Sequence, residues 1–406
     1  MGKKKKLGLV PKLIIGIILG ILIGSFCPEI VCRIVVTASG LFSTFLKFVI
    51  PMMILAYVTM GIADLSQGAG KLLAITAGLS YGSTLIAGSC AFLVAITLFP
   101  SFMDASALEQ IAATAGNSVA SLFSISVTPI LDTLAAVLLA FILGLSLSAM
   151  KGKEIGDTLY NAIKDFSTII DKVLHVAIVP LLPLYICGTF VDMTHSGKTF
   201  VILGILWKVF LVVIAMHLLY LVFAFVVAGG ISHKNPVTLL KNQIPGYTTA
   251  LGTQSSAATI PVNKEACDSI GVPKDVSDLV LPMGCTMHMD GSVLSSITKI
   301  AFLYGVFGMD FSGAGTYGMA IVVAILSAFV LSGAPGGGLV GEMLIVSMFN
   351  FPAEAFPIIA TLGFLFDPAA TCLNASGDTI ASMLVTRLVE GKEWLDKAAA
   401  AKKSRV

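Results

Sequence analysis

Apolar stretches separated by short polar segments dominate the N-terminal part of the chain. They lie at Leu13–Phe26, Val35–Met60, Leu72–Phe99, Ile130–Met150, Phe166–Val191 and Val201–Val227. Most are long enough, as helices, to cross a hydrocarbon core of roughly 30 Å. The first follows Lys3–Lys6 like a secretory signal, but it ends at Cys27 without a small-residue cleavage site, so we expect a retained helix. The pattern predicts an all-α integral membrane protein.

The C-terminal part of the chain is less regular. Two apolar stretches, Val276–Phe307 and Ala355–Val389, are expected to be spans interrupted by polar groups. Two others, Val237–Ile270 and Gly313–Asn350, have a serine-rich and a glycine-rich centre. Lipid cannot satisfy the hydrogen bonds of non-helical backbone, so such centres must be enclosed by protein. We therefore predict two re-entrant hairpins, with tips at Gln254-Ser255-Ser256 and Ser332–Gly338.

The distribution of charge sets the expected orientation, because lysine and arginine accumulate on the cytoplasmic side of membranes. The basic ends of the chain place both termini in the cytoplasm, and residues 101–127, which are acidic and lack Lys and Arg, fall outside. Eight crossings satisfy this distribution if the first hairpin enters from the cytoplasm and the second from outside. Opposed hairpins are typical of inverted-repeat transporters with a binding site at the bilayer midplane.

Composition excludes a soluble globular protein, because 56% of the residues are hydrophobic and only 12% are charged. The balance of 25 basic against 23 acidic residues gives no indication of a nucleic-acid-binding surface. The seven cysteines include no CxxC pair, so neither a disulfide framework nor a zinc site is predicted.

Polar residues recur on one face of the last predicted span. Asp367, Thr371, Asn374 and Asp378 follow one another at three- or four-residue intervals, so they line one side of a helix. Intramembrane carboxylates are costly and are functional candidates by default. Asp367 before Pro368 is also typical of a helix N-cap, an alternative that leaves Asn374 and Asp378 unexplained. We therefore expect this face to bind a ligand.

A second candidate lies at Asp290-Gly291, in the middle of the preceding span. Asp-Gly favours a break in the helix, which frees backbone carbonyls beside a carboxylate, and these are hard oxygen donors suited to Na⁺. A purely structural kink is the alternative. In the hairpin tips, Ser255 and Ser256 offer hydroxyls at a helix N-terminus that attracts carboxylates, and glycines 336–338 allow close approach of backbone. Each tip is alternatively a turn without a ligand.

Four motifs resemble the dicarboxylate/amino acid:cation symporter family, which comprises the glutamate and neutral amino-acid transporters. They occur in the family's order, at Ser255–Val262, Met289–Ser292, Ser332–Gly336 and Asn374–Asp378. The resemblance in topology extends from Leu13 to about Val389. The alanines of the first motif look like the bacterial sodium-coupled serine/threonine branch, whereas Asp290 looks more like the glutamate transporters.

The resemblance implies a homotrimer in a bacterial inner membrane, with a stationary scaffold and a transport domain that moves like an elevator. Residues 1–236 are expected to be mainly scaffold and trimerisation helices, with Leu72–Phe99 and part of 160–191 contributing to the transport domain. Residues 237–392 would form the core transport domain, and residues 393–406 a cytoplasmic tail. The second hairpin is the expected extracellular gate.

The resemblance also assigns roles residue by residue. The substrate α-carboxylate would be held by Ser256 and Asn374, and its ammonium by Asp367 and Thr371. Other residues expected at the substrate pocket are Ser255, Ser292, Ala334, Gly338 and Ala370. Two to three Na⁺ sites are implied: Asp378, Asn374 and Gly284 in the first, Thr286 with Ala328, Phe329 and Leu331 in the second, and Asp290 with Ser83 and Thr84 in the third.

Two departures from the family pattern bear on the substrate and the ions. Acidic-substrate members carry an arginine where this chain has Ala370, and some relatives carry a substituting arginine where it has Gln254. A second substrate carboxylate would then be buried unpaired, at a cost on the order of several kcal/mol, so serine, threonine or alanine is the expected substrate. His288 stands where the family has an asparagine sodium ligand. Four roles of His288 are open: a sodium ligand, a hydrogen-bond donor to Asp290, a group that couples transport to protons, or a residue that only packs in the kink.

Other functions compete with this one. The runner-up is a sodium- or proton-coupled carrier of dicarboxylates or acidic amino acids, with Lys299 as its nearest cation. On an unbroken helix Lys299 faces away from Asp290, so it is expected to be a structural or interfacial charge. A channel is less favoured, because two opposed hairpins suit alternating access better than a continuous pore. An intramembrane enzyme built on Ser255, His288 and Asp290 lacks a nucleophile-elbow pattern, so no enzymatic activity is expected.

Overall fold

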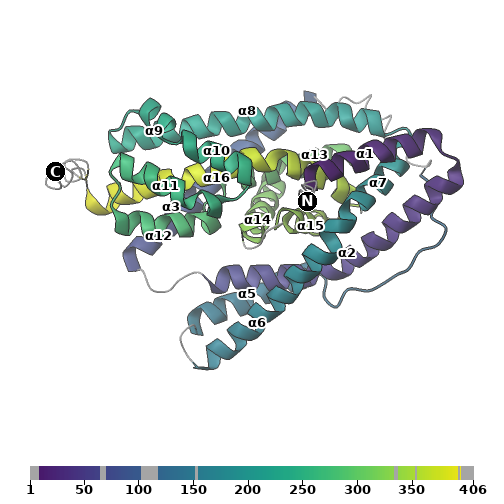
Figure 1. The fold of residues 1–406 in the computed structure, drawn as a ribbon, viewed down its shortest axis with the longest axis horizontal. Coiled ribbons are helices and arrows are strands. Elements are labelled where there is room, and N and C mark those ends of the chain that lie inside the picture. Colours follow the sequence, from purple (N-terminus) through teal and green to yellow (C-terminus); the bar gives the residue numbers. More distant parts are fainter. Residues whose placement is uncertain are drawn as a thin grey trace, which may run out of the picture.

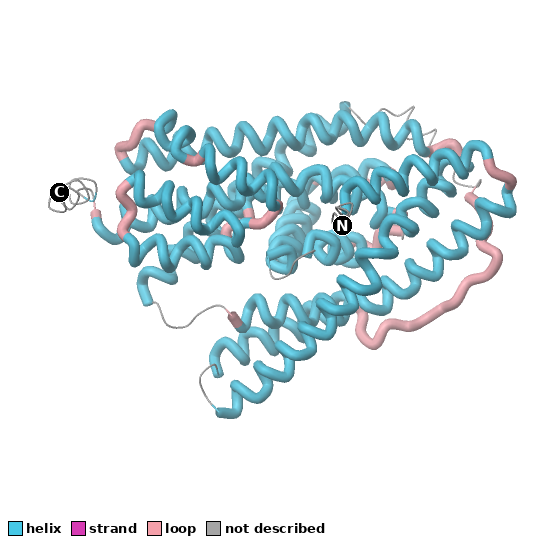
Figure 2. Tube along the Cα trace, viewed as in Figure 1, coloured by secondary structure: helices cyan, strands magenta, loops and turns pink. Residues whose placement is uncertain are grey.

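The computed structural model describes residues 9–64, 70–101, 118–150, 154–332, 337–352, 354–391 and 394. Within these ranges every regular element is helical, as Figure 2 shows. The N-terminal helices are α1 (Leu9–Phe26), α2 (Glu29–Ala63), α3 (Gly70–Leu98), η1 (Phe99–Ser101), α5 (Thr133–Met150), α6 (Glu154–Val173), η3 (Leu174–Ile178), α7 (Val179–His195) and α8 (Thr199–Ser232). The C-terminal helices are α9 (Pro236–Asn242), α10 (Ile244–Thr253), α11 (Ser256–Ile270), α12 (Lys274–Met287), α13 (Asp290–Val306), α14 (Gly313–Ser332), α15 (Gly337–Met348) and α16 (Ala355–Glu390).

Six helical segments of the described chain are long and apolar enough to cross a membrane. They are Glu29–Ala63, Ala74–Ser101, Thr133–Met150, Ile155–His195, Thr199–Ser232 and Ala355–Glu390. Shorter apolar helices lie at Pro11–Phe26, Gly313–Ala328 and Gly338–Met348. The chain is therefore a multi-pass membrane protein with an all-helical fold. The arrangement of eight spans and two re-entrant hairpins stays a prediction.

The helices pack in two groups (Figure 1). In the first group, α2 packs against α5, α6 and α7, and α1 lies along α7. In the second group, α16 is central and contacts α8, α10, α11, α12, α13 and α15, while α3 packs against α13. Contacts of α2 with α14 and α15 join the two groups. Helix α8 thus packs chiefly against the C-terminal helices.

The C-terminal helices form two helix–turn–helix pairs and one broken helix. Helices α10 and α11 meet at a turn where Gln254 adopts the left-handed conformation (φ 51°) and Ser255 caps α11, its hydroxyl accepting from the Ala258 amide at 3.2 Å. The second pair is α14 and α15, whose connection at residues 333–336 lies outside the described residues. The predicted break in this span is present but lies just before the expected position: α12 ends at Met287, His288 and Met289 are not helical, and Asp290-Gly291 begin α13.

The polar groups of the last span do not break its helix. Helix α16 is continuous from Ala355 to Glu390 and contains Pro368 in its interior. Prolines are tolerated within membrane helices where neighbouring groups satisfy the freed backbone carbonyl. The interpretation of Asp367 as an N-cap is therefore also wrong, because no helix begins there.

Three glycines let α1 lie directly on the backbone of α7. A Cβ atom on Gly16, Gly20 or Gly24 would lie 2.6 to 2.7 Å from a carbonyl oxygen of α7. The glycines are four residues apart and so share one face of α1. Small residues at such spacing allow close helix packing in membranes, where hydrophobic burial gives no driving force.

We predict that Gly20→Ala destabilises the protein, because the added Cβ would meet the Cys187 carbonyl oxygen at 2.6 Å and Phe190 Cβ at 2.7 Å. Overpacking of this kind costs about 1–3 kcal/mol. The matched control is Gly204→Ala on α8, where a Cβ has nothing within 4 Å; alanine there should stabilise the helix by up to about 1 kcal/mol. Melting temperatures of the purified protein in detergent measure both effects, and shifts of equal sign would contradict the packing described.

Candidate functional site

The break between α12 and α13 is the centre of the candidate site. His288 (φ −98°, ψ 87°) and Met289 (φ −119°, ψ 40°) are not helical. Helix α13 therefore begins at Asp290, whose side chain lies inside the protein. Asp290 is only 1% exposed. A buried carboxylate must be paired or hydrogen-bonded, and its partners come from a different part of the chain.

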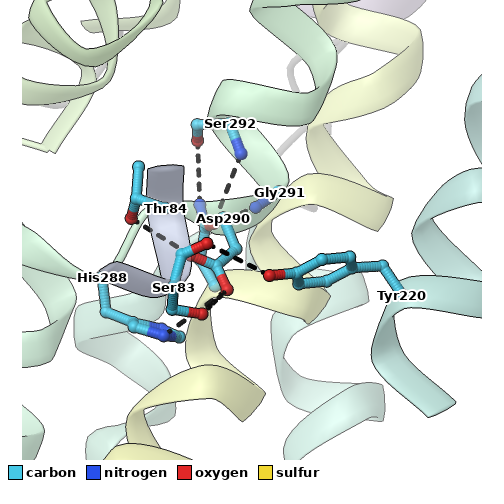
Figure 3. Close-up of polar contacts among 8 residues, drawn as sticks. Ser83, Thr84, Tyr220, His288, Asp290, Gly291 and Ser292 are labelled. Atoms are coloured by element: carbon cyan, nitrogen blue, oxygen red, sulfur yellow. Dashed lines mark hydrogen bonds and ion pairs between the residues drawn. The ribbon is translucent and has the colours of Figure 1, made fainter. Parts of the chain in front are cut away.

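Helix α3 supplies two hydroxyl groups to the Asp290 carboxylate (Figure 3). Ser83 donates to Oδ2, and Thr84 donates to Oδ1 at 3.1 Å. Tyr220 of α8 supports this arrangement by donating to the Ser83 carbonyl at 3.1 Å. The structure therefore brings together the three residues expected in the third sodium site, Asp290, Ser83 and Thr84. A carboxylate with hydroxyl oxygens is a hard-donor set that fits a hard cation such as Na⁺.

His288 belongs to the same cluster. Its Nε2 lies 3.6 Å from Asp290 Oδ2, which is beyond hydrogen-bond range. Its Nδ1 has no hydrogen-bond partner among the described residues. The ring packs against Gly377 of α16, where an added Cβ would collide with it. His288 is thus wedged between the helix break and α16, and its expected part in binding sodium stays a prediction.

Asn374 of α16 ties that helix to the start of α13. Its Oδ1 accepts the amides of Gly291 at 2.8 Å and Ser292 at 3.3 Å, and its Nδ2 donates to Ser292 Oγ at 2.8 Å. The first amides of a helix lack partners within the helix, so Asn374 acts as a cap supplied by another helix. The two predicted site residues Asn374 and Ser292 are therefore in direct contact.

Asp378, one turn beyond Asn374, is 1% exposed. Cys285 donates to its Oδ2 at 3.5 Å, while Oδ1 has no partner among the described residues. The carboxylate lies against Gly284, where a side chain would collide with it. An unsatisfied buried carboxylate oxygen costs about 1–3 kcal/mol or more, so this oxygen fits a site completed by a cation. The expected grouping of Asp378 with Gly284 agrees with this contact.

Residues of the expected second sodium site line one small cavity. It has a volume of about 10 Å³ and is lined by Tyr81, Thr84, Thr286, Met287, Met289, Ile325 and Ala328. This is about the space of one water-sized sphere. Phe329 and Leu331 follow Ala328 in α14, but their side chains lie outside the described residues. Thr286 and Ala328 are thus neighbours, as expected.

The expected substrate residues other than Ser292 of α13 lie at α11, α15 and α16 or, for Ala334, outside the described residues. On α16, Thr371 donates weakly to Asp367 Oδ1 at 3.5 Å, and Ala370 is buried where its backbone touches Gly291. Ser255 and Ser256 are half-buried at the turn before α11, and Asn263 of α11 donates to the Ala375 carbonyl at 2.6 Å, which fixes this arm to α16. Gly338 is half-buried in α15, and Ala334 lies outside the described residues.

Several polar residues near the site escaped the sequence prediction. His217 of α8 is buried, with Nδ1 2.7 Å from the Val213 carbonyl and Nε2 3.0 Å from the Gly291 carbonyl. The signal that points to it is a histidine within an apolar span. Lys299 pairs with Glu342 of α15 at 2.5 Å, and both are buried. Of the two interpretations of Lys299, the structure supports a structural charge and not an interfacial one.

A cavity of about 650 Å³ lies away from these residues. It is lined by α2, by residues 129–134, by the end of α15 and by Phe356 at the start of α16. None of the predicted site residues lines it. We place the functional site at the helix break, because the buried carboxylates with oxygen donors are there.

Comparison with known proteins gives the family. The model of the Sodium:dicarboxylate symporter family matches residues 9–388. Among similar proteins is the mouse Excitatory amino acid transporter 2, 29% identical over 188 residues that are 43% of this chain and 32% of the relative. A second is an Excitatory amino acid transporter of Caenorhabditis elegans, 26% identical over 274 residues, 64% of this chain and 52% of the relative. The chain thus spans from a third to about half of the length of these relatives. Because the family model covers almost the whole described chain, including the helix break and α16, this protein belongs to the Sodium:dicarboxylate symporter family.

Proposed function

We propose that this protein is a secondary transporter that couples the movement of Na⁺ to the symport or exchange of small neutral L-amino acids such as serine, threonine or alanine. The observation that carries the proposal is the cluster at the helix break, where two nearly fully buried carboxylates, Asp290 and Asp378, face hydroxyl, thiol, imidazole and backbone groups. Among the described residues, no lysine or arginine side chain pairs with either carboxylate. Buried negative charge of this kind favours a cation from solution. Membership of a sodium symporter family supports Na⁺ as that cation.

The proposed ion sites follow the contacts just described. One site has Asp378, whose free Oδ1 would meet Na⁺, with Gly284 and Asn374. Another has Asp290 with the hydroxyls of Ser83 and Thr84. A further site has Thr286 with backbone carbonyls of α14 at Ala328, Phe329 and Leu331, beside the small cavity. When Na⁺ binds, its charge offsets that of the carboxylate, so the emptied and loaded sites differ in charge and favour different conformations.

The proposed substrate site has Asp367 and Thr371 for the ammonium and the N-terminus of α11, at Ser255 and Ser256, for the carboxylate. In this structure Asn374 uses its amide to hold the start of α13. It therefore contributes to the pocket chiefly by positioning that helix.

The absence of a guanidinium at Ala370 supports a neutral substrate, since a second carboxylate would need a cationic partner. Lys299 does not offer one, because its ammonium is already paired with Glu342. The competing proposal, a sodium- or proton-coupled carrier of acidic amino acids or dicarboxylates, is favoured by the names of the two relatives, which describe excitatory amino acid transport. We propose no enzymatic activity and no channel, because the family is one of symporters.

The proposed architecture is a homotrimer in a bacterial inner membrane, with both termini cytoplasmic and eight spans. Helices α1, α2, α5, α6 and α7 would form most of the scaffold, and residues 237–392 with α3 the moving transport domain. The packing of α8 against α16 and α13 supports adding α8 to the transport domain, although it lies within residues 1–236. An elevator movement would then slide the second packing group along the first.

Uptake by the purified protein in liposomes tests the function. We expect labelled serine, threonine or alanine to accumulate when an inward Na⁺ gradient is imposed, with saturation at high substrate concentration. Unlabelled neutral amino acids should compete, whereas aspartate and succinate should compete at least about tenfold less well. Uptake that persists unchanged with a proton gradient and no Na⁺ would refute sodium coupling. Preferential competition by aspartate or succinate would favour the acidic-substrate alternative.

The Asp290 ion site predicts a specific change in sodium dependence. Ser83→Ala removes a hydroxyl that touches the carboxylate, so the half-saturating Na⁺ concentration should rise about tenfold. At saturating Na⁺ the KM for the amino acid should change much less. The matched control is Thr97→Ala, also on α3, whose hydroxyl bonds only to carbonyls of its own helix. An equal response of both variants would place the ion elsewhere.

A further inference from the structure

A buried ion pair joins the broken helix to the second helix–turn–helix pair. Lys299 of α13 and Glu342 of α15 are 4% and 3% exposed, and Lys299 Nζ lies 2.5 Å from Glu342 Oε1. Both residues lie in apolar helices of a membrane protein. Taking two charges out of water costs several kcal/mol for each, roughly as much as the attraction between them returns. The pair is therefore poorly explained as a means of stabilising the fold.

The pair is also incomplete on one side. Glu342 Oε2 has no hydrogen-bond partner among the described residues. An apolar pair of similar volume would avoid this unsatisfied acceptor. Charged residues inside membrane proteins are commonly tied to function. Glu342 lies close to the proposed substrate site, so we consider a role in substrate binding.

Helix α16 places the pair next to the carboxylate proposed to bind the substrate ammonium. The Glu342 carboxylate packs against Gly363, where an added Cβ would collide with Oε1 and lie 3.2 Å from Oε2. Gly363 and Asp367 are four residues apart and lie on the same face of α16. Lys299 and Glu342 are both close enough to Asp367 to act on it electrostatically. Three helices thus bring one cation and two carboxylates into a single cluster.

From this geometry we propose that Glu342 is a positioning residue for the substrate: it holds Lys299 in a neutral pair and so leaves Asp367 as the carboxylate available to an ammonium group. The inference rests on the proposed function, in which Asp367 binds the amino group of the substrate. Without Glu342, the ammonium of Lys299 would lose its partner while still acting electrostatically on Asp367. A lysine on its flexible stem would then compete with the substrate for the same oxygens.

The two partners consequently have opposite effects on binding. Removing the negative charge of Glu342 releases a competing cation and weakens binding of the amino acid. Removing the positive charge of Lys299 instead leaves a second carboxylate beside Asp367, which attracts an ammonium more strongly in a medium of low dielectric constant. A pair that only stabilised the fold would give two variants with the same defect, because each leaves one buried charge unpaired.

Four variants in the uptake assay test the inference, with transport rates corrected for the amount of folded protein measured by gel filtration. We expect Glu342→Gln to raise the KM for the amino acid at least about tenfold, with a smaller effect on the maximal rate. Lys299→Met should not raise KM, and the double variant Lys299→Met/Glu342→Gln should return KM to within about threefold of the original value. Asp278→Asn is the control, since it breaks an exposed ion pair with Lys264.

The outcomes separate this inference from the proposed function. The role of Glu342 would be overturned if KM rose equally in both single variants, or if the double variant were as impaired as Glu342→Gln. Sodium-driven uptake by the unaltered protein would not be affected by either result. Failure of the unaltered protein to take up amino acids would overturn both. Should Glu342→Gln not fold, the comparison of Lys299→Met with the unaltered protein remains decisive, because a raised KM in that variant contradicts the inference.

Discussion

An unwound stretch of backbone inside a membrane protein is possible only where the protein itself satisfies the freed hydrogen-bonding groups. In this protein the Asn374 amide meets that requirement, accepting two backbone amides at the start of α13 and donating to the Ser292 hydroxyl. The same bonds fix the register between α13 and α16. Asp290 on one helix and Asp378 on the other are held at set positions as a result. The proposed cation sites, which use both helices, would depend on this junction.

The charges at the site form two separate sets. Asp290 and Asp378 are accompanied by hydroxyl, thiol and backbone groups and, 3.6 Å from Asp290, by the imidazole of His288, and no lysine or arginine of the described residues pairs with them. Glu342 is accompanied by Lys299 and is compensated within the chain. Asp367 belongs to neither set: the hydrogen bond described for its carboxylate is a weak one from Thr371. In the proposed transport cycle, Asp290, Asp378 and Asp367 would exchange their partners, whereas Glu342 would keep Lys299.

Local sequence signals predicted the elements that depend on local chemistry. Asp290-Gly291 indicated the break in the helix, and the polar residues of α16 indicated its buried face. The alternative of an N-cap at Asp367-Pro368 is wrong, because the proline lies here in the interior of a long packed helix. The contact of Ser83 and Thr84 with Asp290 followed from resemblance to the family, since the spacing of 206 or 207 residues has no local signal.

The sequence patterns could not predict which side chains of distant helices pair with one another. Glu342 lies in an apolar stretch far from Lys299, and nothing in the pattern of either helix assigns one to the other. Tyr220 and His217 likewise reach the site from α8, which read as a plain apolar span. The packing of α8 against α16 shows why a division of the chain at residue 236 does not follow the contacts. Such contacts are set by how whole helices pack, which no single segment encodes.

The pairing of Lys299 with Glu342 has a consequence for the response to membrane voltage. A single charge that crosses the membrane gains or loses about 2.3 kcal/mol for each 100 mV of potential. Two opposite charges that travel together contribute nothing to this work, so in the proposed elevator movement α13 and α15 would carry no net charge from this pair. The electrical sensitivity of the proposed cycle would then reside in the carboxylates without a lysine or arginine partner and in the cations that accompany them.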